Sequence, residues 1–378
     1  MSVEIRQHVP GQDLDDFIRA GHVVFAQDPN WIPPLELMIR EQLSPKKNPF
    51  FEHAESALFT AWKDGRLCGR ISAQVDHEHL KRYGDATGFF GFFDTLDDPE
   101  VSKALLDAAQ AWLKQQGMQR IRGPLSLSIN EEVGLLVEGF DTPPMVMMSH
   151  SRPYQGALAE SWGLAKAKDV LAWRYAVSEL PPRAVRAREE IAKLPEVKVR
   201  TANRKDIDNE LRAALEIQDD AWRDNWSHVS MTPNEVHAVV DALKLLINDK
   251  LWIMADIEGQ AAGMCIALPN MNESIADLGG KLLPLGWAKL LWRLKVQRPK
   301  TARLCLLGIK RQYRNVKRYG ALSMAMIAEV QTQGRALGVE WGELSWTLED
   351  NAPVNMAIKM MRGQVYKRYR LYEKAIEA

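Results

Sequence analysis

An internal repeat is the sequence feature that most restricts the fold of this chain. Three patterns occur twice, in the same order, at offsets of 194, 221 and 200 residues. The first pattern is two apolar runs joined by an acid–glycine pair, Asp64-Gly65 in the first half and Glu258-Gly259 in the second. Because the glycine supplies the positive φ of a tight turn, each copy predicts a β-hairpin.

The second pattern is a helix followed by a strand. Asp98-Pro99 is a typical helix start, Gly117 a typical helix end, and an apolar run follows over 121–129. The later copy has a helical apolar stripe over 322–337, Gly338 and a second apolar run. In both copies an asparagine, Asn130 or Asn351, stands 13 residues after the glycine.

The third pattern is a short helix and a closing strand, 153–175 in the first half and 353–372 in the second. Three matches in one order predict two copies of one α/β unit. We therefore expect domains at 1–177 and 196–378. Residues 178–195, charged and bounded by prolines, are expected to form a linker helix.

Composition excludes several classes of protein. The 378 residues are 46% hydrophobic and 26% charged, which is ordinary for a globular protein. Lys+Arg and Asp+Glu are 49 each, and a net charge of zero makes a nucleic-acid partner held by overall charge unlikely. We expect no membrane span, because no run of about 18 apolar residues occurs.

Cysteine and histidine usage predicts where the protein is found and that it holds no metal. The start of the chain lacks the order of a signal peptide, and three widely spaced cysteines are typical of reduced thiols. We therefore expect a cytoplasmic protein. No Cys/His spacing suggests zinc, and the run Asp76-His77-Glu78-His79 is more typical of a solvated strand end, so we expect no metal.

Short sequence motifs add a family resemblance to the repeat. They are DPNWIPP (28–34), NPFF (48–51), FFGFF (89–93), GP (123–124), GLLVEGF (134–140), AWRDNW (221–226), WTLEDN (346–351) and YRLYEK (369–374). With the order of elements in each half, they resemble the GCN5-related N-acetyltransferase (GNAT) fold, present twice. More narrowly, nearly the whole chain is similar to a family of bacterial double-GNAT proteins.

This resemblance implies a fold and a co-substrate. The fold is α/β (α+β), with two tandem GNAT-like domains, each a mixed, mainly antiparallel sheet flanked by helices. The donor would be acetyl-CoA or another acyl-CoA, with its pantetheine arm between the fourth and fifth strands. Its pyrophosphate would lie at the start of the following helix, where backbone N–H groups are unpaired and the helix dipole is positive.

In the second copy these elements correspond to the strand 303–310 and the loop 311–321. The implied cofactor-binding residues are Leu307, Gly308, Ile309, Arg314, Asn315, Val316, Lys317, Gly320, Ala321 and Asn351. The family motif is Arg/Gln-x-x-Gly-x-Gly/Ala, and here Lys317 and Tyr319 stand where small residues belong. Gly320-Ala321 fits only in a shifted register, since a Cβ crowds the pyrophosphate.

In the first copy the equivalent stretch, 92–98, is acidic and poor in glycine. Carboxylates repel a pyrophosphate. We therefore expect the first copy to bind no CoA.

The resemblance also implies a base and an acid near the thioester. Glu343, on the strand 341–346, is the best placed base, and Glu349 comes next. The tyrosine usual about seven residues after the asparagine is missing at 358–360, which leaves Tyr313 as the candidate acid. A solvated strand carboxylate and a packed loop tyrosine are the alternative interpretations.

A long stretch without acids counters the zero net charge. Residues 278–328 contain no Asp or Glu and 12 Lys and Arg, and their apolar spacing around Trp287 and Leu291 indicates an amphipathic basic helix. It is a solvated basic face, a mouth that attracts CoA phosphates or an acidic acceptor, or a surface for anionic membrane or nucleic acid. Nucleic acid is disfavoured because aromatic residues are not interleaved along a strand.

Two hypotheses of function result. The first is an N-acyltransferase that moves an acetyl or acyl group from CoA to an amine acceptor, either a small molecule or a peptide. The alternative is a non-catalytic GNAT-like binding protein, or an aminoacyl-tRNA-dependent transferase of the double-GNAT type. The missing glycines and tyrosine motivate the alternative. Whether the chain forms a homodimer stays open.

Overall fold

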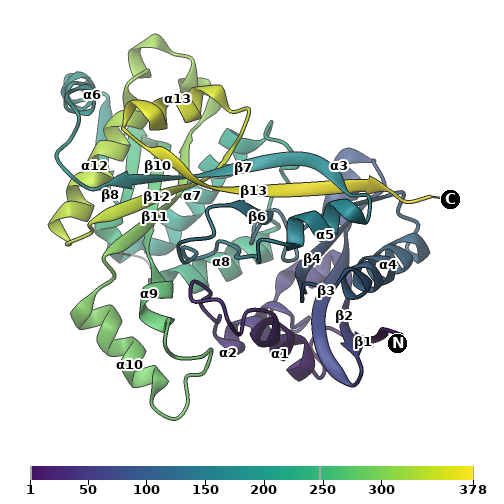
Figure 1. Ribbon diagram of the computed structural model, residues 1–378. Coiled ribbons are helices and arrows are strands. Elements are labelled where there is room, and N and C mark those ends of the chain that lie inside the picture. Colours follow the sequence, from purple (N-terminus) through teal and green to yellow (C-terminus); the bar gives the residue numbers. More distant parts are fainter. Residues whose placement is uncertain (1, 247, 378) are drawn as a thin grey trace. The chain divides into compact units, whose positions relative to one another are not determined.

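The computed structural model describes residues 2–246 and 248–377 of the chain (Figure 1). They fold into two compact units. The first unit comprises Met1–Val170, Ile275–Leu290 and Lys367–Ala378, and the second comprises Leu171–Ser274 and Leu291–Tyr366. The domain limits 1–177 and 196–378 stay a prediction. The expected linker range contains helix α6 (Pro182–Ala192).

The first unit is built on a mainly antiparallel sheet. Strands β1 (Glu4–His8), β2 (Ala54–Lys63), β3 (Arg66–Asp76) and β4 (Thr87–Thr95) are antiparallel neighbours in that order, and β5 (Arg120–Gly123) runs parallel to β4. The end of β13 (Gln364–Ala375) pairs with β5 and with β6 (Leu135–Glu138). Its helices are α1 (Asp15–Val24), α2 (Glu36–Gln42), α3 (His77–Tyr83), α4 (Pro99–Gln115) and α5 (Gln155–Ser161).

The second unit repeats this order. Strands β8 (Val197–Thr201), β9 (Trp252–Ile257), β10 (Gln260–Pro269) and β11 (Thr301–Ile309) are antiparallel neighbours, and β12 (Trp341–Leu348) runs parallel to β11. Strand β7 (Ala165–Ala176) enters this unit at Leu171. The other helices are α7 (Ile207–Trp222), α8 (Pro233–Leu246), α9 (Met271–Ile275), α10 (Gly286–Trp292), α11 (Arg311–Arg314), α12 (Leu322–Ala336) and α13 (Ala352–Met360). Both units thus confirm the predicted α/β class.

The two hairpins form where the repeat predicts them. Asp64 and Gly65 have φ of 52° and 74°, and Glu258 and Gly259 have φ of 52° and 79°. Two successive positive φ values match the twist of antiparallel strands, which explains the acid–glycine pair in both copies.

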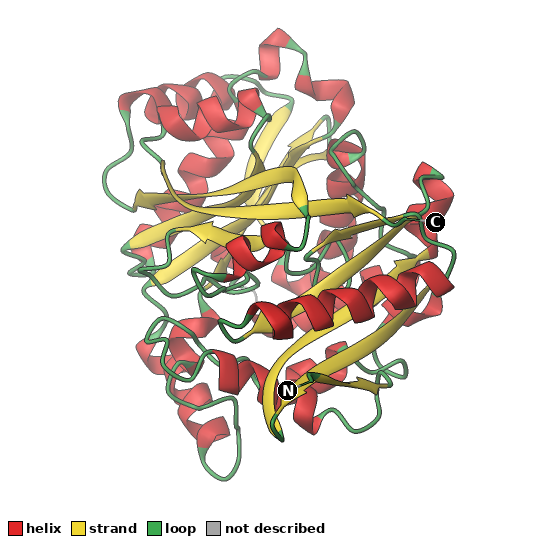
Figure 2. Cartoon of the chain, turned by 45° about the vertical axis from the view of Figure 1, so that its right-hand side comes forward, coloured by secondary structure: helices red, strands yellow, loops and turns green. Residues whose placement is uncertain are grey.

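Helix α4 shows how local sequence fixes an element. The Asp98 carboxylate accepts hydrogen bonds from the amides of Glu100 and Val101, at 2.9 and 3.3 Å, and Pro99 occupies the first turn. The apolar stripe, with Leu105 and Leu113 fully buried, packs against β2 and β3. Figure 2 shows helices lying along the strands of the sheets.

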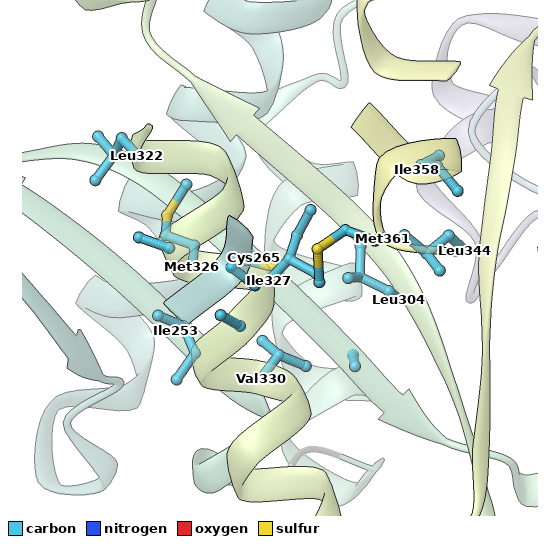
Figure 3. Packing of buried hydrophobic residues seen from close by; sticks show 14 of the residues in the cluster. Ile253, Cys265, Leu304, Leu322, Met326, Ile327, Val330, Leu344, Ile358 and Met361 are labelled. Carbon is cyan, nitrogen blue, oxygen red and sulfur yellow. The ribbon is translucent and has the colours of Figure 1, made fainter. Parts of the chain in front are cut away.

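The core of the second unit lies between α12 and the sheet (Figure 3). Most of its members come from five strands, β7, β9, β10, β11 and β12, and three helices, α6, α12 and α13. They include Ile253, Cys265, Leu304, Leu322, Met326, Ile327, Val330, Leu344, Ile358 and Met361. Leu304 and Leu344 also mark the place where two central strands separate.

No helix in the described ranges is long and apolar enough to cross a membrane.

Candidate functional site

The central strands of the second unit separate halfway along their length. β11 and β12 pair in parallel only from Thr301↔Trp341 to Leu304↔Leu344. β11 nevertheless continues to Ile309 and β12 to Leu348 (Figure 1). Because β11 stays paired with β10 as far as Ile309, it is the β11–β12 seam that opens.

A cleft occupies this opening. It contains about 580 Å³ of space, part of which is open to solvent. Its lining comes from the end of α7, from β11, from β12 and from α13. The residues are Trp222, Asn225, Leu304, Cys305, Leu307, Leu344, Ser345, Trp346, Thr347, Leu348, Asn351, Val354 and Ile358. Mostly apolar walls with a few polar groups suit a flexible apolar ligand.

The cleft's hydroxyl groups are held by hydrogen bonds from behind. Ser345 Oγ donates to Glu343 Oε1 and accepts from Arg303 Nε at 2.7 Å. Thr347 Oγ1 accepts from Trp173 Nε1 at 2.8 Å and donates to Asn355 Oδ1 at 2.7 Å. Both hydroxyls are therefore fixed in orientation before any ligand arrives.

Glu343, the predicted base, lies behind the cleft. Its side chain has no exposed surface, and its second carboxylate oxygen accepts a hydrogen bond from the Tyr366 hydroxyl. The Arg303 guanidinium, also buried, lies 3.8 Å away. Glu343 is not among the described residues that line the cleft. It is connected to the cleft by its hydrogen bond from Ser345, which does line it.

The other two predicted catalytic residues lie elsewhere. Glu349 follows β12 and is half-buried, two residues before the cleft residue Asn351. The Tyr313 ring packs 5.9 Å from the Tyr319 ring and against the core of the second unit. Neither is among the described residues that line the cleft.

The predicted cofactor-binding residues of β11, and Asn351 before α13, have different environments in the structure. Leu307 lines the cleft, as does Asn351, which also caps α13 by accepting from the Val354 amide at 3.4 Å. A Cβ on Gly308 would lie 3.2 Å from the Ala221 Cβ, so this glycine lets α7 lie against β11. Ile309 is half-buried, ends β11 and packs against the core.

In the loop between β11 and α12, most of the cationic side chains bind other groups of the protein. Arg314 Nη2 donates to the Ala221 carbonyl at 2.5 Å, Arg311 pairs with Asp220 and Asp224, and Arg318 pairs with Glu196 at 2.7 Å. Asn315, Val316 and Lys317 are exposed, and Lys317 has no ion pair in the described part of the chain.

The start of α12 is the remaining anion-binding feature of this loop. The Gly320 amide donates to the Lys317 carbonyl at 3.2 Å, so it is engaged in the turn. Ala321 precedes the helix and offers no capping side chain. The first N–H groups of α12 thus lack a side-chain cap at the positive end of the helix dipole, with Lys317 nearby in sequence.

In the first unit the same seam is filled by the chain itself. β4 and β5 pair only over Thr87–Phe89, and then Leu125 follows. The Leu125 amide donates to the Phe90 carbonyl at 2.8 Å, and Gln74 Nε2 donates to the Leu125 carbonyl at 2.8 Å. A Cβ on Gly91 would lie 1.8 Å from that carbonyl oxygen, which shows how closely the loop fits.

The start of α4, the helix that follows β4 in the first unit, is not open to an anion. The Asp98 carboxylate already occupies the amides at the start of α4, and Asp94 is buried in an ion pair with Arg70 at 2.7 Å. These contacts give a structural reason for expecting no CoA in this copy, which stays a prediction. No group of three or more His, Cys, Asp or Glu suited to a metal occurs among the described residues.

Sequence reasoning missed Ser345, Thr347, Asn225 and Cys305 as cleft residues. The signal for the first two is the alternation of polar residues at 343, 345 and 347, which places them on one face of a strand. Asn225 and Cys305 carry no such signal, because their position depends on how α7 packs on β11.

Comparison with known proteins gives both relatives and a fold. Protein YghO of Escherichia coli (strain K12) is 41% identical over 98% of this chain and 95% of its own length. The bacterial ceramide synthase of Caulobacter vibrioides is 42% identical over 96% of this chain and 95% of its own. A tandem GNAT protein from the clavulanic acid biosynthesis pathway aligns with a TM-score of 0.60 at 12% identity, covering 100% of this chain and 99% of that one. No protein-family model matches the chain.

The filled seam of the first unit predicts the effect of Gly91→Ala. Overpacking against backbone should lower the free energy of unfolding by at least about 2 kcal/mol, measured by urea unfolding. Gly334→Ala, where the added Cβ has no contact under 3.7 Å inside α12, should be neutral or raise stability by up to about 1 kcal/mol. An unchanged Gly91→Ala protein would show that the loop does not fill the seam.

The buried Glu343 network predicts a large effect of Glu343→Leu. Removing this carboxylate takes a negative charge from beside the buried Arg303 guanidinium and breaks the hydrogen bonds from Ser345 and Tyr366, which should cost about 3–5 kcal/mol in chemical denaturation. Glu340→Leu, which removes an exposed carboxylate paired with Lys300, serves as the control and should change stability little. Equal effects of the two variants would contradict a buried network.

Proposed function

Because this chain belongs to the same family as Protein YghO and the bacterial ceramide synthase, within the GNAT superfamily, we propose that it is an N-acyltransferase with CoA as the acyl carrier. The observation that carries the proposal is the apolar cleft where β11 and β12 part. The second unit would be the catalytic one, since the corresponding seam of the first is filled.

The cleft suits the arm of a CoA thioester. An extended arm bearing amides can hydrogen-bond to strand backbone that has lost its neighbour, as peptides do at a sheet edge. Beyond Leu304, β11 offers such backbone toward the seam. The uncapped start of α12 and the exposed Lys317 would hold the pyrophosphate.

For the acceptor we propose the primary amine of a long-chain amino alcohol. The relative named bacterial ceramide synthase supports this class, since a ceramide is the N-acyl derivative of such an amine. The cleft also agrees with an apolar substrate, because Leu304, Leu307, Trp346 and Ile358 form much of its wall.

In the proposed reaction the neutral amine nitrogen attacks the thioester carbonyl, the C–N bond forms and the C–S bond breaks. CoA leaves as a thiolate, which takes up the proton that the amine loses. The amine must lose one proton. Ser345 Oγ would accept that proton as its own moves to Glu343, to which it already donates a hydrogen bond. Arg303 and Tyr366 hold Glu343 in place during the transfer.

One observation favours the rival function, a binding protein without catalysis. The Gly320 amide, which the family motif would offer to the pyrophosphate, is engaged with Lys317. In that case a ligand would bind the cleft and no acyl product would form, whereas an aminoacyl-tRNA-dependent enzyme would form product only with a charged tRNA.

Calorimetry with acetyl-CoA and longer acyl-CoAs tests the donor, and mass spectrometry of a long-chain amino alcohol incubated with each tests the reaction. We expect tighter binding with longer chains and an amide product.

Cys305 provides an independent reporter, because it lines the cleft while Cys68 and Cys265 are buried.

Acyl-CoA should slow the labelling of Cys305 by a small maleimide, with Cys305→Ser as the unlabelled control. Burial raises the pKa of the Cys305 thiol, so labelling of the free protein should be slow near neutral pH and accelerate only above the ordinary thiol range. Absence of both heat and protection with every acyl-CoA would reject the CoA donor.

Ser345→Ala should lower kcat about a hundredfold and leave the Kd of acyl-CoA nearly unchanged, because the proposed proton path loses its hydroxyl. Ser345→Thr keeps the hydroxyl and should restore a good part of the activity. If Ser345→Ala retains full kcat across pH, the proton leaves by another route, such as water.

A further inference from the structure

Residues 281–298, which we call the basic–aromatic segment, expose an unusual amount of apolar surface. The segment contains α10 and the π-helical turn Arg293–Gln297. Six of the sixteen large hydrophobic side chains exposed in the described residues lie within positions 283–296. They are Leu283 (81%), Leu285 (72%), Trp287 (52%), Leu291 (46%), Trp292 (59%) and Val296 (55%). Single exposed hydrophobics are common, but such a cluster marks an interaction surface.

The charges of this segment all have one sign. It holds five Lys and Arg and no Asp or Glu. Lys289 pairs with Asp277, and Arg293 Nη1 donates to the Ser274 carbonyl at 2.9 Å. Lys281, Lys295 and Arg298 are exposed and form no ion pair with any described residue. These three cations flank the exposed apolar side chains on both sides in sequence.

Both N–H groups of Trp287 donate hydrogen bonds within the segment. Trp287 Nε1 donates to the Pro284 carbonyl at 3.1 Å, and the Trp287 amide donates to the Leu282 carbonyl at 2.9 Å. Trp287 and Leu291 are four residues apart and so share one helix face. This face can therefore leave water without leaving the tryptophan N–H unpaired.

The partner must match both features. Tryptophan and leucine beside lysine and arginine are typical of helices that lie in the interface of an anionic bilayer. A nucleic acid would contact the cations but leave the apolar side chains in water. In a symmetric contact with a second copy, like charges would face each other.

We propose that the basic–aromatic segment docks this protein on the surface of a bilayer that contains anionic lipids. The exposed leucines and tryptophans enter the interfacial region, and Lys281, Lys295 and Arg298 face the lipid headgroups. This inference rests on exposure and charge and is independent of the proposed function, since a protein without acyltransferase activity would still dock.

The segment precedes a cleft strand closely in sequence. The segment ends at Arg298 and β11 begins at Thr301, with Leu304 of the cleft on the same strand. Both the cleft and this end of the segment belong to the second unit.

Sedimentation of the full-length protein with unilamellar vesicles tests the proposal. We expect binding to phosphatidylcholine vesicles that contain phosphatidylglycerol, little binding to phosphatidylcholine alone, and weaker binding as salt screens the charges. Trp287→Glu and Trp292→Glu should each weaken binding at least about tenfold, since the interface repels a carboxylate where an indole was favoured. Lys295→Glu should weaken it about fivefold or more per charge removed.

Val185→Glu is the matched control, because Val185 is an exposed apolar residue of α6, outside the segment. It should bind vesicles like the unaltered protein. Wild-type binding by Trp287→Glu and Trp292→Glu would overturn the proposal. So would self-association through the segment in light scattering without vesicles, or displacement of the protein from vesicles by RNA.

Discussion

The loss of pairing between β11 and β12 beyond Leu304 and Leu344 is the constraint on which the second unit depends. Parallel strands that part expose backbone and apolar side chains, and the structure must cover or use them. Here α7 and α13 supply the walls, and Gly308 allows α7 to approach β11. In the first unit the same problem is solved by Leu125, which pairs with Phe90.

Much of the fold follows from local sequence. The hairpins at Asp64-Gly65 and Glu258-Gly259 and the capped start of α4 were predictable, because turn and cap chemistry acts over a few residues. A strand also follows each of α4 and α12 as predicted, but the first, β5 (Arg120–Gly123), is shorter than the run 121–129. The domain limits 1–177 and 196–378 stay a prediction, and β7 and β13 each have residues in both compact units.

The candidate site was predicted only in part. Leu307 and Asn351 line the cleft, and Glu343 is linked to it by Ser345. The burial of Glu343 could not be read from the strand, because the partners Arg303 and Tyr366 come from distant positions in the chain. The resemblance implied Arg314 as a cofactor-binding residue, which stays a prediction; in this structure Arg314 binds the Ala221 carbonyl, and Arg311 and Arg318 pair with acidic side chains.

Because the chain itself fills the seam of the first unit, the two units should differ in how their stability depends on ligand. A ligand stabilises only the folded state that binds it, in proportion to its free concentration relative to Kd. The contacts of Leu125 and Gln74 are intramolecular, so their contribution does not depend on any concentration. The seam of the first unit is therefore filled at every ligand concentration, while the free energy of unfolding of the second unit would rise with the concentration of its ligand.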